Sequence, residues 1–219
     1  MTPDIADRRP SELELLLRAA RRAGAGAGKP ARRWGQRPAP LLLFLTDPRR
    51  TPHPEAAAAR LPRGCAVLFR AFGDADAACV GRRLKAVARR RGLFLLAGAD
   101  PALARAIGAD GVHLPERLAH RARALRRGRP GWVVTAAAHS RASILRAARA
   151  GVDAVLVSPV FESLSPSAGR PLTLVRFAAL ARGAPVPVYA LGGVDGRTAR
   201  RLTGSGAAGL AAVGAVART

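Results

Sequence analysis

The sequence predicts a small (β/α)8 barrel, in which eight parallel strands, each followed by a helix, close into a ring. Eight short apolar runs recur between residue 41 and the end of the chain, and helix-length segments rich in arginine and alanine separate them. Strands that are apolar on both faces and alternate with helices are typical of a parallel sheet covered on both sides. Eight such units in one domain favour a closed barrel over an open doubly wound sheet.

The expected elements alternate regularly along the chain. Strands are expected at residues 41–46, 65–70, 93–98, 110–114, 132–137, 153–158, 186–191 and 208–214. Helices are expected near residues 54–61, 75–91, 101–107, 117–127, 140–150, 172–182 and 195–204, with a short stub at 215–219. Gly108, Gly151 and Gly206 stand where a helix ends and a strand follows at once, which suits the left-handed conformation that closes many helices. Because the helices are short, we expect a small barrel.

Residues 1–38 differ in composition from the rest and are interpreted as an N-terminal extension of a barrel domain at 39–219. Ser11 and Glu14 have the spacing of a capping box, which predicts a helix from about Ser11 to Ala23. The stretch that follows, "GAGAGKPARRWGQRPAP", has the glycine, proline and arginine content of a linker. We therefore expect the extension to be mobile or loosely docked.

The formal net charge of +23 raises the question of nucleic-acid binding, because a basic surface attracts polyphosphate. Nearly all of this charge is arginine, and it is spread over almost every expected helix. Aromatic residues make up 4% of the chain, so there is no platform on which bases would stack. These features favour arginine on solvated helix faces and make nucleic-acid binding an unfavoured alternative.

The chain also lacks the signals of a membrane or secreted protein. No window approaches eighteen consecutive apolar residues, and the N-terminus opens with acids instead of a basic leader. We expect a soluble cytoplasmic protein with no membrane partner. Cys65 and Cys79 have no CxxC spacing and are expected to be free thiols. The sequence leaves the oligomeric state open.

Two glycine-containing turns mark the candidate binding site. Gly192 and Gly193 follow the seventh expected strand, and Val213 and Gly214 follow the eighth. Barrel enzymes commonly bind phosphate with backbone N–H groups in these two loops. Glycine allows a ligand to approach the backbone closely and allows positive φ, so successive amides can converge on an anion. The turns predict a phosphate cup, and the alternative is a tight strand-to-helix turn with no ligand.

Several motifs together carry a family resemblance. They are "LLLFLTDP" at 41–48, "GADGVHL" at 108–114, "AHS" at 138–140, "SPVFESLSPSAGRPL" at 158–172, "PVYALGGV" at 187–194 and "GAAGLAAVGAV" at 206–216. In order and spacing they resemble the thiamine-phosphate synthase/TenI superfamily. The resemblance implies a (β/α)8 barrel whose synthase members join a pyrimidine diphosphate to a thiazole phosphate with Mg²⁺ and release pyrophosphate. It also implies that the two glycine-containing turns hold the thiazole phosphate.

The chain departs from the synthase pattern where the diphosphate is bound. Arg70 is kept, but Leu68 and Phe72 stand where the family has glutamine and lysine. In the loop after the sixth strand, Ser163 and Ser165 keep the hydroxyl groups, while Pro166 replaces a lysine. Arg70 and the two serines are therefore predicted to contact substrate, with fewer cations than the family pattern supplies.

The metal-binding acids of the pattern are also altered. Gly98 and Ala99 stand in place of an Asn-Asp pair, and the position of the second acid falls near Leu118. Asp100 and Glu116 are the nearest carboxylates, so they are the candidate ligands if Mg²⁺ is bound. The resemblance implies Mg²⁺ for a synthase and no cofactor for the second branch of the family.

That second branch consists of thiazole tautomerases, which bind a thiazole phosphate carboxylate and move a proton on it. Their acid/base histidine maps onto His139, and histidine suits this role because its ordinary pKa lies near neutrality. Ala137 takes the place of a family serine two residues earlier. Synthase and tautomerase activity both remain open, together with a third possibility, a non-catalytic sensor of a phosphate ligand.

Two further features are interpreted conservatively. His113 ends the fourth expected strand and is taken as a hydrogen-bonded structural residue outside the catalytic set. Glu162 and Arg170 flank a loop with the serine, glycine and proline content of a lid, although a surface loop with no role in closure fits equally well.

Overall fold

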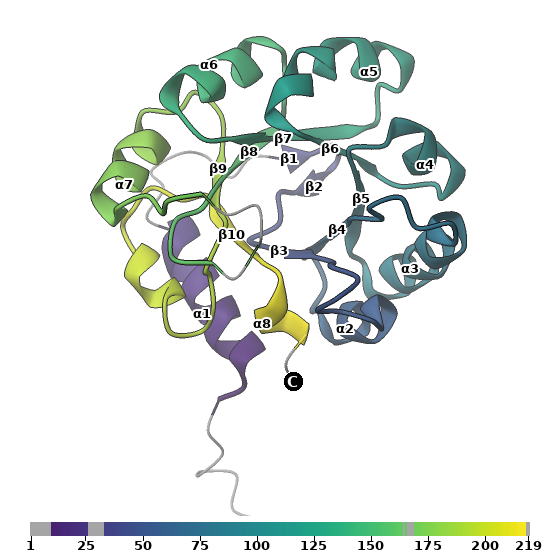
Figure 1. Ribbon diagram of the computed structural model, residues 1–219, viewed down its shortest axis with the longest axis horizontal. Coiled ribbons are helices and arrows are strands. Elements are labelled where there is room, and N and C mark those ends of the chain that lie inside the picture. The colour runs from purple at the N-terminus through teal and green to yellow at the C-terminus, as the bar shows by residue number, and fades with distance from the viewer. Residues whose placement is uncertain (1–9, 26–32, 164, 166–168, 218–219) are drawn as a thin grey trace, which may run out of the picture.

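The computed structural model describes residues 10–25, 33–163, 165 and 169–217 (Figure 1). Eight parallel strands form a closed barrel in the order β10-β3-β4-β5-β6-β7-β8-β9, and the helices lie around it. The pairing of Leu210 in β10 with Leu42 in β3 closes the ring. The predicted (β/α)8 barrel is confirmed.

Each barrel strand falls on an expected apolar run, within one or two residues at most ends. The strands are β3 (Leu42–Leu45), β4 (Ala66–Phe69), β5 (Phe94–Gly98), β6 (Gly111–Leu114), β7 (Val133–Ala138), β8 (Ala154–Val157), β9 (Val188–Ala190) and β10 (Gly209–Ala212). Successive residues of a strand point to opposite faces, and here both faces are buried. In β3, Leu43 and Leu45 face the barrel interior, while Leu42 and Phe44 pack under the helices.

The helices also follow the expected order, with two differences. They are α2 (Pro54–Arg60), α3 (Ala77–Arg91), α4 (Pro101–Ala106), α5 (Ala122–Gly128), α6 (Arg141–Arg149), α7 (Leu174–Arg182) and α8 (Gly214–Ala217), with 3-10 turns η2 (Glu116–Arg121) and η3 (Ala199–Leu202). The helix expected at 117–127 is divided between η2 and α5. The helix expected at 195–204 is reduced to η3.

A local hydrogen-bond network begins the segment where a helix was expected at 195–204. The Asp195 carboxylate accepts from the amides of Arg197 and Thr198 at 2.9 and 2.8 Å. The Thr198 hydroxyl accepts from the Asp195 amide and donates to the Gly193 carbonyl. This reciprocal pattern is that of a capping box, and the Arg201 amide after it donates to the Thr198 carbonyl, three residues back, at 3.0 Å, so the segment continues as a 3-10 turn.

The part of the expected linker that the structure describes packs into the amino-terminal end of the barrel, where the strands begin. Strands β1 (Arg33–Trp34) and β2 (Arg37–Pro38) form a small antiparallel ladder. The Trp34 side chain is buried, and its ring centroid lies 5.4 Å from that of Phe94 and 6.0 Å from that of Tyr189. The linker interpretation was therefore wrong for these residues. The Trp34 ring packs against the barrel, and amino-acid composition does not predict such a contact.

Helix α1 (Glu12–Ala25) confirms the capping-box prediction, but it is not loosely docked. Leu16, Ala19, Ala20 and Ala23 are buried against the outer core of the barrel. The helix packs on β10 and η3 and lies beside α8 (Figure 1). It covers the part of the barrel where the chain's own last helices are short. Division of the chain into units at 1–38 and 39–219 stays a prediction.

Leu16→Ala is expected to lower the free energy of unfolding by about 2–5 kcal/mol, because it leaves a cavity under a fully buried side chain. Arg18→Ala is the control, since Arg18 is exposed on the same helix and arginine and alanine are both strong helix formers. Urea unfolding followed by circular dichroism would compare the two variants. Equal stability of both would contradict the docking of α1.

None of the helices that the structure describes is long and apolar enough to cross a membrane.

Candidate functional site

A cavity of about 750 Å³ opens at the carboxyl-terminal end of the barrel strands. Loops that follow the strands from opposite sides of the ring contribute to its wall. It is lined by every residue that the sequence predicted to bind substrate or to catalyse: Arg70, His139, Ser163, Ser165, Gly192, Gly193, Val213 and Gly214. The structure thus brings together residues from loops that lie far apart in the chain.

The turn after β9 requires glycine for steric reasons. Gly192 and Gly193 have φ angles of 93° and 64°, which favour glycine. A Cβ atom on Gly193 would clash with the carbonyl oxygen of Glu162 and would lie 2.7 Å from the Cβ of Phe161. The loop after β8 is held against this turn by a hydrogen bond of 3.0 Å from the Phe161 amide to the Gly192 carbonyl. Close packing therefore demands glycine here whether or not a ligand is bound.

The same turn leaves backbone donors at the cavity wall. The amides of Gly192, Gly193 and Val194 have no acceptor among the residues that the structure describes. Further along, the Gly196 amide donates to Glu12 of helix α1 at 2.7 Å. Within this loop, the open donors that the structure describes therefore lie at the glycine turn and not further along.

A second backbone segment faces the same part of the cavity. Val213, Gly214 and Ala215 follow β10, and the N–H groups at the start of a helix have no intrahelical acceptor. Gly214 is unlike Gly193, because a Cβ placed on it would meet nothing within 4 Å. Strands β9 and β10 are neighbours in the barrel, so the two turns lie side by side. Converging amides of this kind form a concave site suited to an anion.

His139 begins the loop after β7 and is held in a defined orientation. Its ring Nδ1 lies 2.7 Å from the carbonyl oxygen of Ser158, so Nδ1–H donates, and Nε2 is unprotonated in the neutral ring. Its backbone amide donates to Glu116 and Ser143, and Ser140 caps helix α6 immediately after it. The side chain is exposed in the cavity, where Nε2 can accept a proton from a bound molecule.

The two carboxylates that sequence analysis named for Mg²⁺ are engaged elsewhere. Asp100 caps helix α4 and accepts from the amides of Ala102 and Leu103 at 2.8 and 2.9 Å. Glu116 accepts from the His139 amide and pairs with Arg146 at 3.3 Å. Neither residue lines the cavity.

Two other acids lie at the cavity wall. Asp195 and Glu162 contribute to the wall, but Asp195 is held by backbone amides. Within the described ranges, no group of three or more His, Cys, Asp or Glu side chains could hold a metal ion. Mg²⁺ takes one or two carboxylates together with water and phosphate oxygens. Asp100 and Glu116 are engaged elsewhere and lie outside the cavity wall, so they do not fit the ion that the resemblance implies for a synthase.

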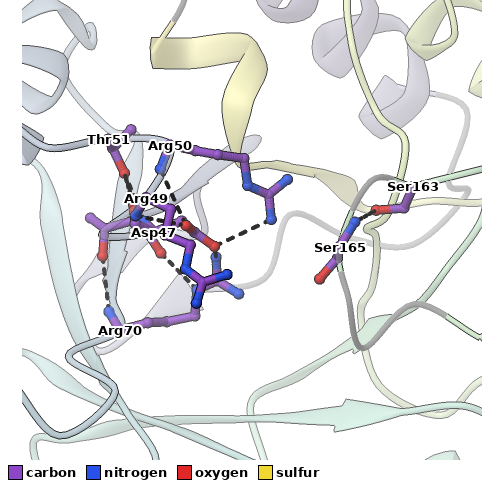
Figure 2. Close-up of polar contacts among 8 residues, drawn as sticks. Asp47, Arg49, Arg50, Thr51, Arg70, Ser163 and Ser165 are labelled. Carbon is purple, nitrogen blue, oxygen red and sulfur yellow. Dashed lines mark hydrogen bonds and ion pairs between the residues drawn. The ribbon is translucent and has the colours of Figure 1, made fainter.

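A charged cluster that was not expected from the sequence lies after β3. The Asp47 Oδ2 atom accepts from Arg50 at 3.2 Å and from Arg70 at 3.3 Å (Figure 2). Burial raises the pKa of Asp47, but the hydrogen bond from Arg50 and the charges of both arginines outweigh it and lower the pKa. Arg50 and Arg70 both line the cavity. The signal was the charged stretch "TDPRRT" directly after a strand, where a barrel places its site.

His113 also lines the cavity, although the sequence interpretation made it purely structural. Its Nδ1 atom lies 2.9 Å from the Thr135 hydroxyl. Burial and, to a lesser extent, the charge of Arg70 lower the pKa of His113 to about 4. The ring is therefore neutral near pH 7 and offers a hydrogen-bonding nitrogen at the cavity wall.

The lowered pKa predicts a pH-dependent stability. Between about pH 6.5 and 4 the unfolded chain binds a proton at His113 that the folded protein does not. Stability is therefore complete above pH 6.5 and is expected to fall by up to about 3 kcal/mol as the pH drops to 4. Urea unfolding at a series of pH values should show a shallower decline for His113→Gln. Identical pH profiles for the two proteins would refute this assignment.

The loop after β8 supplies the serine hydroxyl groups. Ser163 and Ser165 line the cavity, and the Ser165 amide donates to the Ser163 hydroxyl at 3.3 Å (Figure 2). The two ends of this loop are joined by a hydrogen bond of 2.8 Å from the Leu172 amide to the Pro159 carbonyl. Pro166, which replaces the family lysine, lies outside the described residues. The lid interpretation stays a prediction.

Comparison with known proteins points to one family. Residues 42–216 match the TMP-TENI family, described as thiamine monophosphate synthase. A thiamine-phosphate synthase of Thermus thermophilus is 38% identical over 122 residues, covering 53% of this chain and 56% of the relative. That of Chloroflexus aurantiacus is 32% identical over 139 residues, covering 61% of this chain and 62% of the relative. The chain thus matches less than two thirds of the length of either relative.

The fold has a similar counterpart among solved structures. A thiamine phosphate pyrophosphorylase from Pyrococcus furiosus superposes with a TM-score of 0.68 at 22% identity, covering 78% of this chain and 84% of that one. At this identity the likeness concerns the fold.

Proposed function

Because the chain belongs to the thiamine monophosphate synthase (TMP-TENI) family, we propose that it is an enzyme of thiamine biosynthesis that binds a thiazole phosphate in the barrel cavity. The observation that carries this proposal is the pair of neighbouring turns at Gly192–Gly193 and Val213–Gly214. Their amides offer several donors to a phosphate and need no side-chain charge. The thiazole ring then extends from the cup into the cavity.

The activity we favour is transfer of a pyrimidine group from its diphosphate to the thiazole phosphate, with release of pyrophosphate. The relatives are named for thiamine-phosphate synthesis, and Arg70 lines the cavity beside the proposed phosphate cup. The negative charge that develops on the leaving pyrophosphate would be stabilised by fixed cations in the wall. No step is assigned to Mg²⁺, because the carboxylates described above do not fit it.

A second candidate activity rests on His139. Its Nδ1–H group is used by the Ser158 carbonyl, so Nε2 is available to take a proton from a bound thiazole phosphate and return it at another atom. The proton count is unchanged over the cycle, as a tautomerase requires. This activity needs no diphosphate site and no cofactor.

A mass-spectrometric assay would test these candidates. The purified protein would be incubated with thiazole phosphate, its carboxylated tautomer, pyrimidine diphosphate, and either Mg²⁺ or a chelator. Thiamine phosphate above background would support the transferase, and isomerised thiazole alone would support the tautomerase. Tight binding of thiazole phosphate with neither product would favour a sensor. Failure to bind thiazole phosphate would overturn the proposed function.

A further inference from the structure

Helix α1 reaches the loop that carries the glycine turn of the proposed phosphate cup. The Glu12 Oε1 atom accepts a hydrogen bond of 2.7 Å from the Gly196 amide, although the two residues lie 184 positions apart in the chain. Gly196 is buried and follows Gly193 by three residues. Figure 1 shows α1 beside α8, on the side of the barrel where the chain ends. The N-terminal helix therefore contacts the loop that forms one side of the cup.

The helix and the loop are also in close van der Waals contact. A Cβ atom on Gly196 would lie 2.9 Å from the Leu15 Cβ and 3.0 Å from the Glu12 Oε2 atom. No side chain thus separates the loop backbone from the first turn of α1. The hydrogen bond from Gly196 to Glu12 is part of a packed contact, and the Glu12 side chain is half-buried in it.

The amides of four consecutive residues in this loop each have an acceptor. The Thr198 hydroxyl accepts from the Asp195 amide, and the Asp195 carboxylate accepts from the amides of Arg197 and Thr198. The Gly196 amide, in contrast, relies on an acceptor outside the loop. Because a buried donor without an acceptor is costly, removal of the Glu12 carboxylate would force the loop to shift toward water.

A shift of this segment would reach the glycine turn. The Thr198 hydroxyl donates to the Gly193 carbonyl at 2.7 Å, and Asp195 and Thr198 both line the cavity. On its other side the turn is held by the Phe161 amide, which donates to the Gly192 carbonyl. The turn is thus fixed between the loop after β8 and the segment that helix α1 holds.

The same helix supports the second half of the proposed cup. It packs on β10 and lies beside α8, which begins at Gly214. Both α8 and η3 are short, so α1 takes the place of longer barrel helices on this side. Glu12 itself does not line the cavity, so it acts on a ligand only through the loop.

We infer that Glu12 is a positioning residue for the phosphate cup. By holding the Gly196 amide, it keeps the open amides of the glycine turn converged on one anion. The nature of that anion rests on the proposed function, whereas the contact itself rests on the geometry of α1 and the loop. Donors that are already ordered bind more tightly than donors that must be ordered by the ligand. The N-terminal helix is then required for binding as well as for stability.

Hydrogen exchange of the backbone amides, followed by NMR in the ligand-free full chain, would test the contact. In Glu12→Ala the Gly196 amide should exchange about 10-fold faster or more, because a charge-assisted hydrogen bond is lost. Glu12→Gln keeps a side-chain oxygen and should retain most of the protection. Glu14→Ala is the matched control, since Glu14 is exposed on the same turn of α1 and accepts from the Ser11 amide instead.

Titration calorimetry of the same variants would measure the consequence for the cup. Glu12→Ala is expected to bind thiazole phosphate about 10-fold more weakly, because part of the binding free energy must then order the loop. Glu12→Gln and Glu14→Ala should bind within about 3-fold of the wild type, because neither removes the acceptor for Gly196. Rescue by glutamine distinguishes positioning through this hydrogen bond from general destabilisation of α1. Circular dichroism would check that each variant is folded.

Three results would overturn the inference. They are unchanged exchange of the Gly196 amide in Glu12→Ala, faster exchange with unchanged affinity for the ligand, and equal losses in Glu12→Ala and Glu14→Ala. The last would show that only the order of the helix start matters.

A parallel titration with inorganic phosphate separates the inference from the proposed function. If the wild type bound inorganic phosphate but not thiazole phosphate, the proposed function would be rejected. Weaker binding of inorganic phosphate by Glu12→Ala would still support the positioning role, and equal binding would refute it. A wild-type protein that bound neither ligand would overturn both the proposed function and the inference.

Discussion

Gly214→Asp is expected to weaken the binding of thiazole phosphate by about 100-fold or more, because it adds a carboxylate beside the proposed phosphate cup. The structure makes this substitution informative. Gly214 lines the cavity, and a Cβ placed on it meets nothing within 4 Å, so the variant should fold normally. Calorimetric titration with thiazole phosphate, with circular dichroism as a check on folding, would measure the effect.

The matched control is Gly214→Ala, which adds a Cβ without charge and should bind thiazole phosphate nearly as the wild type does. Gly193 would be a poor choice, because any side chain there clashes with the loop after β8 and must adopt a positive φ. A loss of binding in a Gly193 variant would therefore report strain instead of charge. Unchanged affinity in Gly214→Asp would show that the phosphate does not bind at this turn.

His139→Ala is expected to reduce isomerisation of a thiazole phosphate carboxylate by about 100-fold or more, the usual contribution of a positioned acid/base. Its affinity for the ligand should change little, because the proposed cup lies on the loops after β9 and β10. His139→Gln is a second test, since its amide can still donate to the Ser158 carbonyl but provides no nitrogen that titrates. The measurement is kcat and KM for the isomerisation.

His53→Ala serves as the control for loss of a histidine. His53 is exposed before helix α2 and makes no side-chain capping bond, so its removal should not affect turnover. If isomerisation survived in both His139 variants, His139 would not be the acid/base. If isomerisation were absent from the wild type as well, the tautomerase candidate itself would be rejected.

The barrel could be predicted because its signal is repeated and local. Strands of a closed parallel sheet are buried on both faces, so each appears as a short apolar run such as the one at β4 (Ala66–Phe69). The position of the proposed phosphate cup came from the same order, since the loops after the last two strands of such a barrel carry Gly192–Gly193 and Val213–Gly214. Neither inference needed knowledge of contacts between distant side chains.

Predictions that depended on distant contacts were incomplete or wrong. The composition of residues 1–38 indicated a mobile or loosely docked extension, yet Trp34 is buried against Phe94 and Tyr189, and Leu16 is buried in the outer core. The content of glycine and arginine indicates how flexible a segment is by itself. It does not indicate which part of the fold a single large side chain will pack against. Asp100 was an acid at a suitable place in the chain, but its side chain caps the helix that follows it.

The sequence by itself determined the barrel, the order of its strands and the end at which the cavity opens. It did so because burial on both faces makes each strand a short apolar run, and helix-length segments with polar faces separate these runs. Only the tertiary structure decided that Asp47 lies between Arg50 and Arg70 and that Ser158 sets the tautomer of His139. The contacts from Arg70 to Asp47 and from His139 to Ser158 join loops that meet only when the ring of strands closes, so no local pattern in the chain could specify these two contacts.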